Sequence, residues 1–443
     1  MAGKGIGQMN MGAGKGTTAY FVTSDGGVSL ANDNLFLSHR KWNTSVNNVP
    51  EFIDYTPVVN TYGYNGIEHT FELDKRCTYI GKMDLLYRRQ AVLGLQDYDQ
   101  YNPVSYVQFH DWEGYSCIDR IEMEYLNKLV YSKSGEEMYY EMMMTKDQNY
   151  ISTQSHLQGH NRNDLEKMQD ATSEQWVVVD LSLPFEKFRK QVPIIALPNK
   201  IRFKVYFKNL KQCIITDGAG SPTCEISEMI LRCHGIHLPE GYQSAIFNEI
   251  KDGGYSIKIT STEWHRKEVF TATSTAVDQT WSLPLRNIKN YCFEMMIVVR
   301  PQSCVEPAAV SDGLDLWTCI VPTEWWIEDA GSEVTQRYEG ERNHRKGYSR
   351  YVQSRLAHPK STHHSLPLIE FVPNNAYNTF TEGSEDDSFG GRQFNRYNNP
   401  VLKLRFAAGH PDLAQGVQYY VDAIAKIHNN ILFTKGDMRR FLL

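Results

Sequence analysis

Alternation of apolar and polar side chains recurs along this chain and limits its fold more than any other sequence feature. The clearest case is residues 201–208, IRFKVYFK, in which every second side chain from Ile201 to Phe207 is apolar. Successive side chains of a β-strand point to opposite faces, so a period of two predicts a strand with one buried and one solvated face. Helical patterning is sparse. The chain is therefore predicted to be all-β.

Further strands are expected throughout the chain, and a cluster of turn-forming residues divides it into two halves. Alternating or β-branched segments occur at 69–87, 121–125, 177–185, 291–299 and 401–406. A dense Gly/Ser/Pro cluster, IITDGAGSPT, occupies 214–223 and is typical of a linker. We predict a flexible, glycine-rich N-terminal arm over 1–30, a first β unit over 31–213, a linker over 214–226 and a second β unit over 227–443.

The composition fits two globular units. The chain has 443 residues, 41% hydrophobic and 22% charged, which suffices for two cores of about 200 residues each. Its net charge of −6 argues against a protein that coats nucleic acid directly. No run of 18 apolar residues and no secretory h-region is present. The eight cysteines are scattered without any C-x-x-C pair, which predicts free thiols in a reducing cytosol.

Two motifs that suggest ligand binding fail on their spacing. GAGKG at 12–16 resembles a phosphate loop, but Met9 stands at the first glycine position, and Gly16 replaces the Ser or Thr. His234, His237 and Glu240 suggest a cupin-like metal set, yet cupins need two histidines two residues apart on one strand. We expect a strand end there instead.

The other candidate sites have plain interpretations. His156 and His160 have helical spacing but lack the glutamate of H-E-x-x-H, which favours a loop. Residues 337–360 interleave basic and tyrosine side chains, which fits a solvated loop or inter-subunit contact, or alternatively a contact with an anionic partner. The acidic residues 382–388 fit a solvated loop or, alternatively, a Ca²⁺ site. The sequon at Asn43 carries little weight. We predict no catalytic, cofactor-binding or metal-ligating residue and no enzymatic activity.

A collinear set of landmarks runs along residues 30–443. The most specific is Leu183-Pro184-Phe185, followed by PIIAL at 193–197 and the alternating strand 201–207. The others are Lys75-Arg76 with IGKMDL at 80–85, IDRIEMEY at 118–125 with the turn Ser132–Gly135, LPLRNIKNYCFEMMIVVR at 283–300, and Asn430–Leu432 with Gly436. In this order the landmarks resemble those of the double jelly-roll major capsid proteins of nucleocytoplasmic large DNA viruses and their relatives, and the chain resembles a divergent member of this family.

The resemblance implies two tandem eight-stranded jelly-roll barrels with long inter-strand loops. It also implies a structural major capsid protein that trimerises into pseudo-hexagonal capsomers of an icosahedral double-stranded DNA virus. Implied partners are two further copies, neighbouring capsomers, and minor capsid and penton proteins. Contact with an internal membrane stays open, and direct sequence-specific nucleic-acid binding is not expected. The implied location is the virion, assembled in the host cell. The alternatives are a minor capsid or vertex protein of the same lineage and a two-domain cupin-like metalloprotein.

Overall fold

The fold is taken from a computed structural model of the chain. The structure describes residues 20–22, 28–30, 49–59, 62–95, 107–145, 148–158, 166, 170–181, 183–185, 191–216, 220–252, 255–305, 316–317, 319–339, 367–371, 391–434 and 437–442. Of the predicted N-terminal arm over 1–30, only a short antiparallel pair, β1 (Tyr20–Val22) with β2 (Val28–Leu30), lies within this part.

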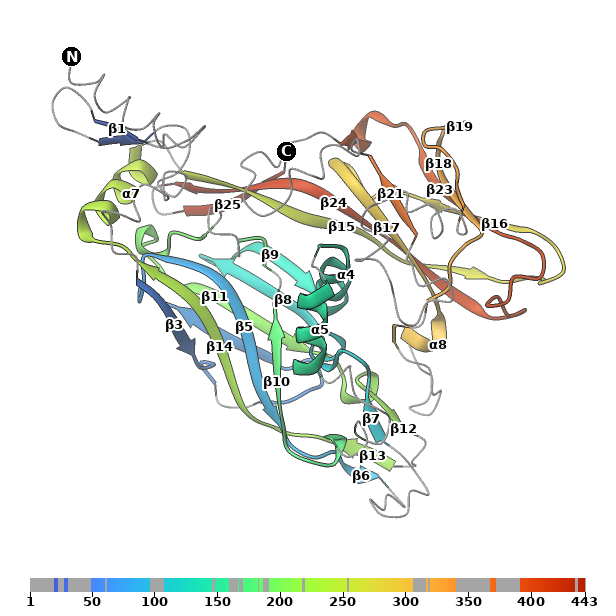
Figure 1. Cartoon of the computed structure of the whole chain (residues 1–443), viewed down its shortest axis with the longest axis horizontal. Helices are drawn as coiled ribbons and strands as arrows, with labels where there is room; N and C mark the ends of the chain where they lie inside the picture. The colour runs from blue at the N-terminus through green and yellow to red at the C-terminus, as the bar shows by residue number, and fades with distance from the viewer. Residues whose placement is uncertain are drawn as a thin grey trace.

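A first jelly roll is formed by eight strands in two antiparallel sheets (Figure 1). One sheet has the order β10-β5-β14-β3 and the other β4-β11-β8-β9. The strands are β3 (Val49–Tyr55), β4 (Glu68–Leu73), β5 (Tyr79–Arg89), β8 (Ile118–Tyr125), β9 (Lys128–Ser134), β10 (Gln175–Asp180), β11 (Ile201–Phe207) and β14 (Ile226–His237).

A second jelly roll repeats this arrangement with the orders β15-β24-β17-β21 and β16-β23-β18-β19. Its strands are β15 (Tyr255–Thr271), β16 (Gln279–Pro284), β17 (Tyr291–Pro301), β18 (Glu324–Asp329), β19 (Ser332–Glu333), β21 (Leu368–Glu370), β23 (Pro400–Phe406) and β24 (Gln418–Thr434). At the margins, β20 (Tyr338–Glu339) pairs with β18, β22 (Arg392–Gln393) with β17, and β25 (Asp437–Leu442) with β24.

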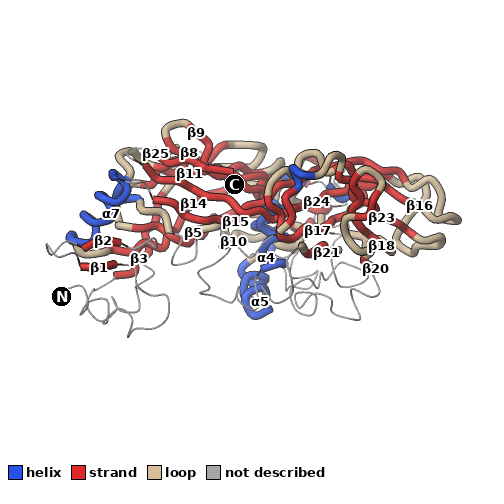
Figure 2. Tube along the Cα trace, turned by 90° about the horizontal axis from the view of Figure 1, so that it is seen from above, coloured by secondary structure: helices blue, strands red, loops and turns tan. Residues whose placement is uncertain are grey.

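The two rolls have the same connectivity. In each, the sixth, third, eighth and first strands form one sheet, and the second, seventh, fourth and fifth form the other. This is the double Greek-key order of a jelly roll. The predicted fold class, two tandem jelly rolls, is therefore confirmed, although each roll consists of two facing sheets rather than the barrel that the sequence analysis expected. The rolls lie side by side along the long axis of the molecule (Figure 2).

Strand alternation produces the cores as predicted. Ile201, Phe203, Val205 and Phe207 of β11 are all buried, whereas Arg202 between them is exposed. Strands β5 and β8 alternate in the same way. Apolar side chains from the facing sheets thus fill the space between them, and burial of this area is the main stabilising term of each roll. No disulfide is formed among the cysteines, as the sequence indicated.

Within 214–226, where the sequence analysis expected a linker, the structure shows paired strands. Within that range β12 (Ile214–Thr216) pairs with β7 (Val107–Phe109), and β13 (Gly220–Thr223) pairs with β6 (Leu93–Leu95). The next strand, β14, lies between β5 and β3 in the middle of a first-roll sheet. The Gly/Ser/Pro cluster therefore belongs to a strand connection within the first roll, because the residues typical of linkers are also those that tight turns require.

Helices are more frequent than the sequence pattern indicated. The α-helices are α3 (Glu113–Cys117), α4 (Gly135–Thr145), α5 (Gln148–Leu157), α7 (Glu240–Asp252) and α8 (Gln302–Val305), and the 3₁₀-helices are η3 (Ile194–Ala196), η4 (Leu210–Gln212) and η6 (Phe394–Arg396). Both α4 and α5 lie between the two rolls (Figures 1 and 2). Helix α7 connects β14 to β15.

Helix α4 starts where the sequence analysis placed a turn, Ser132–Gly135. Strand β9 instead continues to Ser134, and the hairpin turn lies at Leu126 and Asn127, both left-handed at φ 51° and 60°. A capping box starts the helix: the Ser134 hydroxyl accepts from the Glu137 amide, and the Glu137 carboxylate accepts from the Ser134 amide. Gly135 is required here because a Cβ would overlap the carbonyl oxygens of Tyr115 and Ile118.

We predict that Gly135→Ala lowers the free energy of unfolding by about 2–4 kcal/mol, because backbone atoms must move to admit the methyl group. Gly241→Ala in α7 is the matched control, since a Cβ there meets nothing within 4 Å. That control should be neutral or stabilising by up to about 1 kcal/mol. Urea denaturation of both variants checks the prediction, and equal effects at the two glycines would contradict it.

Candidate functional site

The contact between the two rolls contains polar side chains from both of them. It is formed by the outer face of the second-roll sheet β15-β24-β17-β21 and by α4 of the first roll. Strand β17 has both faces buried over most of its length. Met295, Ile297 and Val299 belong to the core of the second roll, whereas Met296 and Val298 belong to the apolar cluster that continues into the first roll.

Near-continuous apolar sequence explains why β17 can be buried on two sides. Residues 295–299, MMIVV, are apolar at every position, as expected of a strand covered on both faces. Strand β24 supplies Ile424 to the inter-roll cluster, and Ile431 and Phe433 extend it. The two rolls are thus joined through shared core, which resists relative motion more than the polar interfaces usual between domains.

A buried ionic cluster crosses this contact. Arg300 of β17 is 0% exposed, and its Nη2 donates to Asp422 of β24 at 2.8 Å and to Glu136 of α4 at 3.0 Å. Lys208, which follows β11, donates to the other oxygen of Glu136 at 3.2 Å. Two cations and two carboxylates from both rolls therefore offset one another. A buried charge of this kind persists only when it is paired and hydrogen-bonded.

The pKa of Glu136 reflects this pairing. Burial alone would raise it, but Arg300 and Lys208 together hold the pKa of this carboxyl well below its usual value. The neighbouring Glu137, besides capping α4, accepts a hydrogen bond from the hydroxyl of Thr262 in β15 at 2.9 Å. The first turn of α4 is therefore bound to two strands of the second roll.

Aromatic side chains pack beside the ionic cluster. The rings of Tyr139 in α4 and Trp317 have centroids 3.8 Å apart, and Tyr140 lies edge-on to Trp264 of β15 at 6.4 Å. The indole of Trp317 donates to the carbonyl oxygen of Asp111 at 2.5 Å. Farther along, Lys128 of β9 pairs with Asp437 of β25 at 3.4 Å. The contact thus combines apolar, aromatic and ionic parts over several elements.

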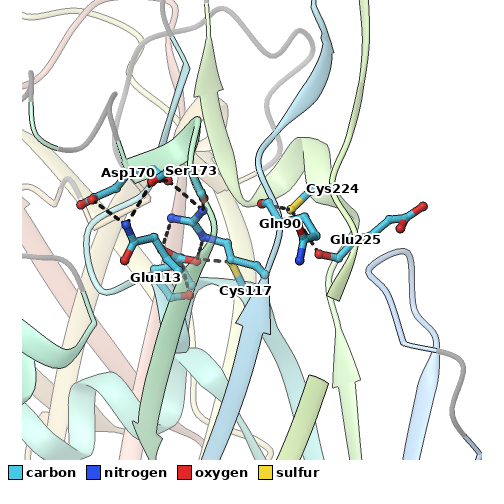
Figure 3. Close-up of polar contacts among 10 residues, drawn as sticks. Gln90, Glu113, Cys117, Asp170, Ser173, Cys224 and Glu225 are labelled. Atoms are coloured by element: carbon cyan, nitrogen blue, oxygen red, sulfur yellow. Dashed lines mark hydrogen bonds and ion pairs between the residues drawn. The ribbon is translucent and has the colours of Figure 1, made fainter. Parts of the chain in front are cut away.

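A second buried ion pair supports the first roll itself. Arg89, at the end of β5, donates from Nε to Oε1 of Glu113 at 2.5 Å and from Nη1 to the carbonyl oxygens of Asp170 and Ser173. Figure 3 shows these acceptors converging from two segments, one with Glu113 and one with Asp170 and Ser173, and Cys224 on the other side. Burial opposes the charge, but Glu113 outweighs it and raises the pKa of Arg89. This cluster is closed, so we assign it to stability rather than to ligand binding.

The histidines that suggested a metal set lie apart in separate pairs. In β14, His234 contacts Asp84 at 3.2 Å, and His237 contacts Glu51 at 2.5 Å. Strand β14 ends at His237, as predicted. Among the described residues, no three His, Cys, Asp or Glu side chains are placed to share a metal ion. The cupin-like alternative therefore gains no ligand set from this region.

The remaining predicted sites are only partly placed by the structure. His156 lies in the last turn of α5 (Gln148–Leu157), which corrects the expected loop for that residue. His160, GAGKG at 12–16, Asn43, residues 340–360 and residues 382–388 lie outside the described residues. Within the described part, no helix combines the length and apolar character that crossing a membrane requires.

Sequence reasoning missed the inter-roll contact. Arg300, Asp422 and Glu136 were not singled out, because their partners lie more than 100 residues away in sequence. One signal was available: apolar residues fill both faces of β17, which predicts a strand covered on both sides. The pattern does not reveal which part of the chain packs on the second face of this strand.

We predict that Arg300→Met lowers the free energy of unfolding by about 3–5 kcal/mol, because Glu136 and Asp422 would stay buried without their shared cation. Arg337→Met is the control, since Arg337 makes an exposed pair with Glu333 and should matter by about 1 kcal/mol or less. Chemical denaturation measures both. A similar loss of unfolding free energy at the two sites would show that the buried cluster stabilises the protein no more than an exposed ion pair does.

Acid should weaken the same contact. A carboxyl with a lowered pKa contributes stability above its ordinary pKa of 4.5 and loses it as the pH falls through the lowered value. We therefore expect the Glu136 contribution to be constant from pH 7 to about pH 5.5 and to decline below about pH 4.5. Thermal unfolding between pH 3 and pH 7 should show a shallower acid slope for Glu136→Gln. Parallel pH profiles for the two proteins would contradict this.

Comparison with known proteins supports the fold assignment. No protein-family model matches the chain, and no curated protein matches its sequence. Solved structures do match. A chain of the PBCV-1 virus capsid is 11% identical with a TM-score of 0.59, covering 90% of this chain and 97% of that one. The Faustovirus major capsid protein is 9% identical, with a TM-score of 0.60 and coverage of 98% and 97%.

A third match is a chain of the Sputnik virophage structure, 7% identical with a TM-score of 0.58 and coverage of 89% of this chain and 88% of that one. All three matches cover about nine tenths of this chain or more. Identities this low establish shared architecture and not shared activity. The chain thus has the double jelly-roll fold of the major capsid proteins of nucleocytoplasmic large DNA viruses and virophages.

Proposed function

We propose that this chain is a major capsid protein, the repeating subunit of the outer shell of an icosahedral double-stranded DNA virus. The observation that carries the proposal is the pair of jelly rolls with identical strand order, lying side by side and joined by a shared core. The similar solved structures support it, because one is named as a major capsid protein and another comes from a virus capsid.

Geometry explains why two fused rolls suit a shell. Three chains supply six rolls of the same topology, so a trimer with threefold symmetry acquires a nearly hexagonal outline. Hexagonal units tile a flat facet. The buried ionic and aromatic contact between the rolls keeps each chain rigid, so the outline is defined before assembly begins.

The proposal includes the partners that such a unit needs. These are two further copies in the trimer, neighbouring capsomers, and minor capsid and penton proteins, with the virion as the location. Weak, repeated contacts between trimers would allow misplaced units to leave, while multivalency stabilises the closed shell. No catalytic step and no sequence-specific contact with nucleic acid is part of the proposed role.

We also propose a revised division of the chain. The first roll runs through the end of β14 at His237, α7 (Glu240–Asp252) forms the connection, and the second roll begins with β15 at Tyr255. Strand pairing supports this division, because β14 bonds to β5 and β3, and β15 bonds to β24.

Native mass measurement tests the proposed function. We expect a particle of three times the 51.0 kDa chain mass, with a hexagonal outline in negative stain. In purified virions this chain should be the most abundant protein, which separates a major subunit from a minor or vertex protein. A protein that stays monomeric at all concentrations and never assembles would refute the proposal.

A further inference from the structure

The outer face of the first-roll sheet β10-β5-β14-β3 repeats the residue pattern that the second roll buries in the inter-roll contact. In the second roll, Leu368, Met296 and Ile424 stand opposite one another on β21, β17 and β24. Two positions along, the opposing residues are Glu370, Glu294 and Lys426. An apolar row thus lies beside a row of two acids and one base.

The equivalent strands of the first roll carry the same two rows. Val178, Leu86 and Ile230 stand opposite one another on β10, β5 and β14. The neighbouring row consists of Asp180, Asp84 and Arg232. On the third strand of each roll, β5 or β17, the charged residue comes two positions before the apolar one. On the sixth strand, β10 or β21, and on the eighth, β14 or β24, it comes two positions after. The two patterns therefore coincide strand by strand.

The two faces differ in what covers them. In the second roll, Met296, Leu368 and Ile424 are at most 3% exposed, because the first roll packs on them. In the first roll, Leu86, Val178 and Ile230 are only half-buried. On the edge strands of that sheet, Trp176 is 44% exposed and Phe52 67% exposed. One copy of the pattern is therefore covered within the chain, whereas the apolar row of the other stays partly exposed, although Asp180 of its charged row is buried.

We propose that this open face binds the second roll of another copy of the chain and forms the contact between subunits. The inference rests on the proposed function and names the surface that the trimer uses. The contact within the chain is head-to-tail, since a sheet face of the second roll packs on the α4 side of the first. In a trimer, first and second rolls alternate around a ring. The ring closes only if the open face of each first roll packs on the second roll of the neighbouring chain. The side used there is the one that carries β18, β19 and β20, which corresponds to the α4 side of the first roll.

Charges on the open face are already balanced, so a partner can cover them without leaving an unpaired ion. Lys82 contacts both Asp84 and Asp180 at 3.1 Å. Arg232 makes a two-pronged pair with Asp54, both contacts being 2.8 Å long. The buried counterpart behaves alike, since Lys426 pairs with Glu294 at 3.1 Å. The apolar row and the two aromatic side chains would supply the favourable burial.

Charge placed in the apolar row tests the proposal in the full-length protein. Leu86→Glu and Ile230→Glu should raise the dissociation constant of the trimer by about 100-fold or more, while Trp176→Ala should raise it about tenfold. Leu86→Met should keep the trimer, because it preserves apolar area. Sedimentation over a concentration series measures assembly, and thermal unfolding of the monomeric fraction establishes that each variant folds.

Leu129→Glu is the matched control, since Leu129 is an exposed leucine of the other first-roll sheet. A trimer that survives both Leu86→Glu and Ile230→Glu would overturn the assignment of this face and leave the proposed function intact. Equal dissociation of the Leu129 control would overturn it as well. A wild-type chain that forms no trimer would instead refute the proposed function.

Discussion

Burial of both faces of the sheet formed by β17 and β24 is the constraint on which the rest of the structure depends. One face closes the second roll, and the other packs on the first. A sheet in this position cannot hold a lone charge, so Arg300 must bring partners, and they come from both rolls as Asp422 and Glu136. Helix α4 is bound in turn, because its first turn supplies Glu136 and the capping residue Glu137. The local start of one short helix is thereby tied to the arrangement of the whole molecule.

The local alternation of apolar and polar residues predicted the strands well where one face is exposed to solvent and the other is buried. Strand β11 is the clearest example, because its alternation is unbroken and its buried residues are those expected. The strand order was not readable from periodicity, since pairing such as that of β15 with β24 joins segments more than 140 residues apart. That part of the fold came from resemblance. Strands β12 and β13 lie in the range expected to be a linker and pair with β7 and β6, because glycine, serine and proline mark a turn inside a roll as readily as a passage between rolls.

The inter-roll contact was harder to predict for a related reason. An arginine near the end of an apolar strand is compatible with a solvated strand end, and only the folded chain brings Glu136 to it. Helix α7 was missed although Ile246 and Ile250 have helical spacing and are both buried. Its other residues are largely polar, so the apolar stripe is narrow. In both cases the decisive information is which surface lies opposite, and a single sequence does not contain it.

Pairing between the first and last strands of the second roll bears on how the chain can be made. Strand β15 has 17 residues and pairs along most of them with β24, which begins only at Gln418. Closing so long a loop is entropically costly and slow, and it must await synthesis of β24 (Gln418–Thr434). The first roll closes a loop of similar length, since its first strand β3 pairs with its last strand β14, but β14 is complete by residue 237. During translation the first roll would offer a finished template on which the β17 and β24 face later condenses, so that folding proceeds in the same direction as the ribosome moves.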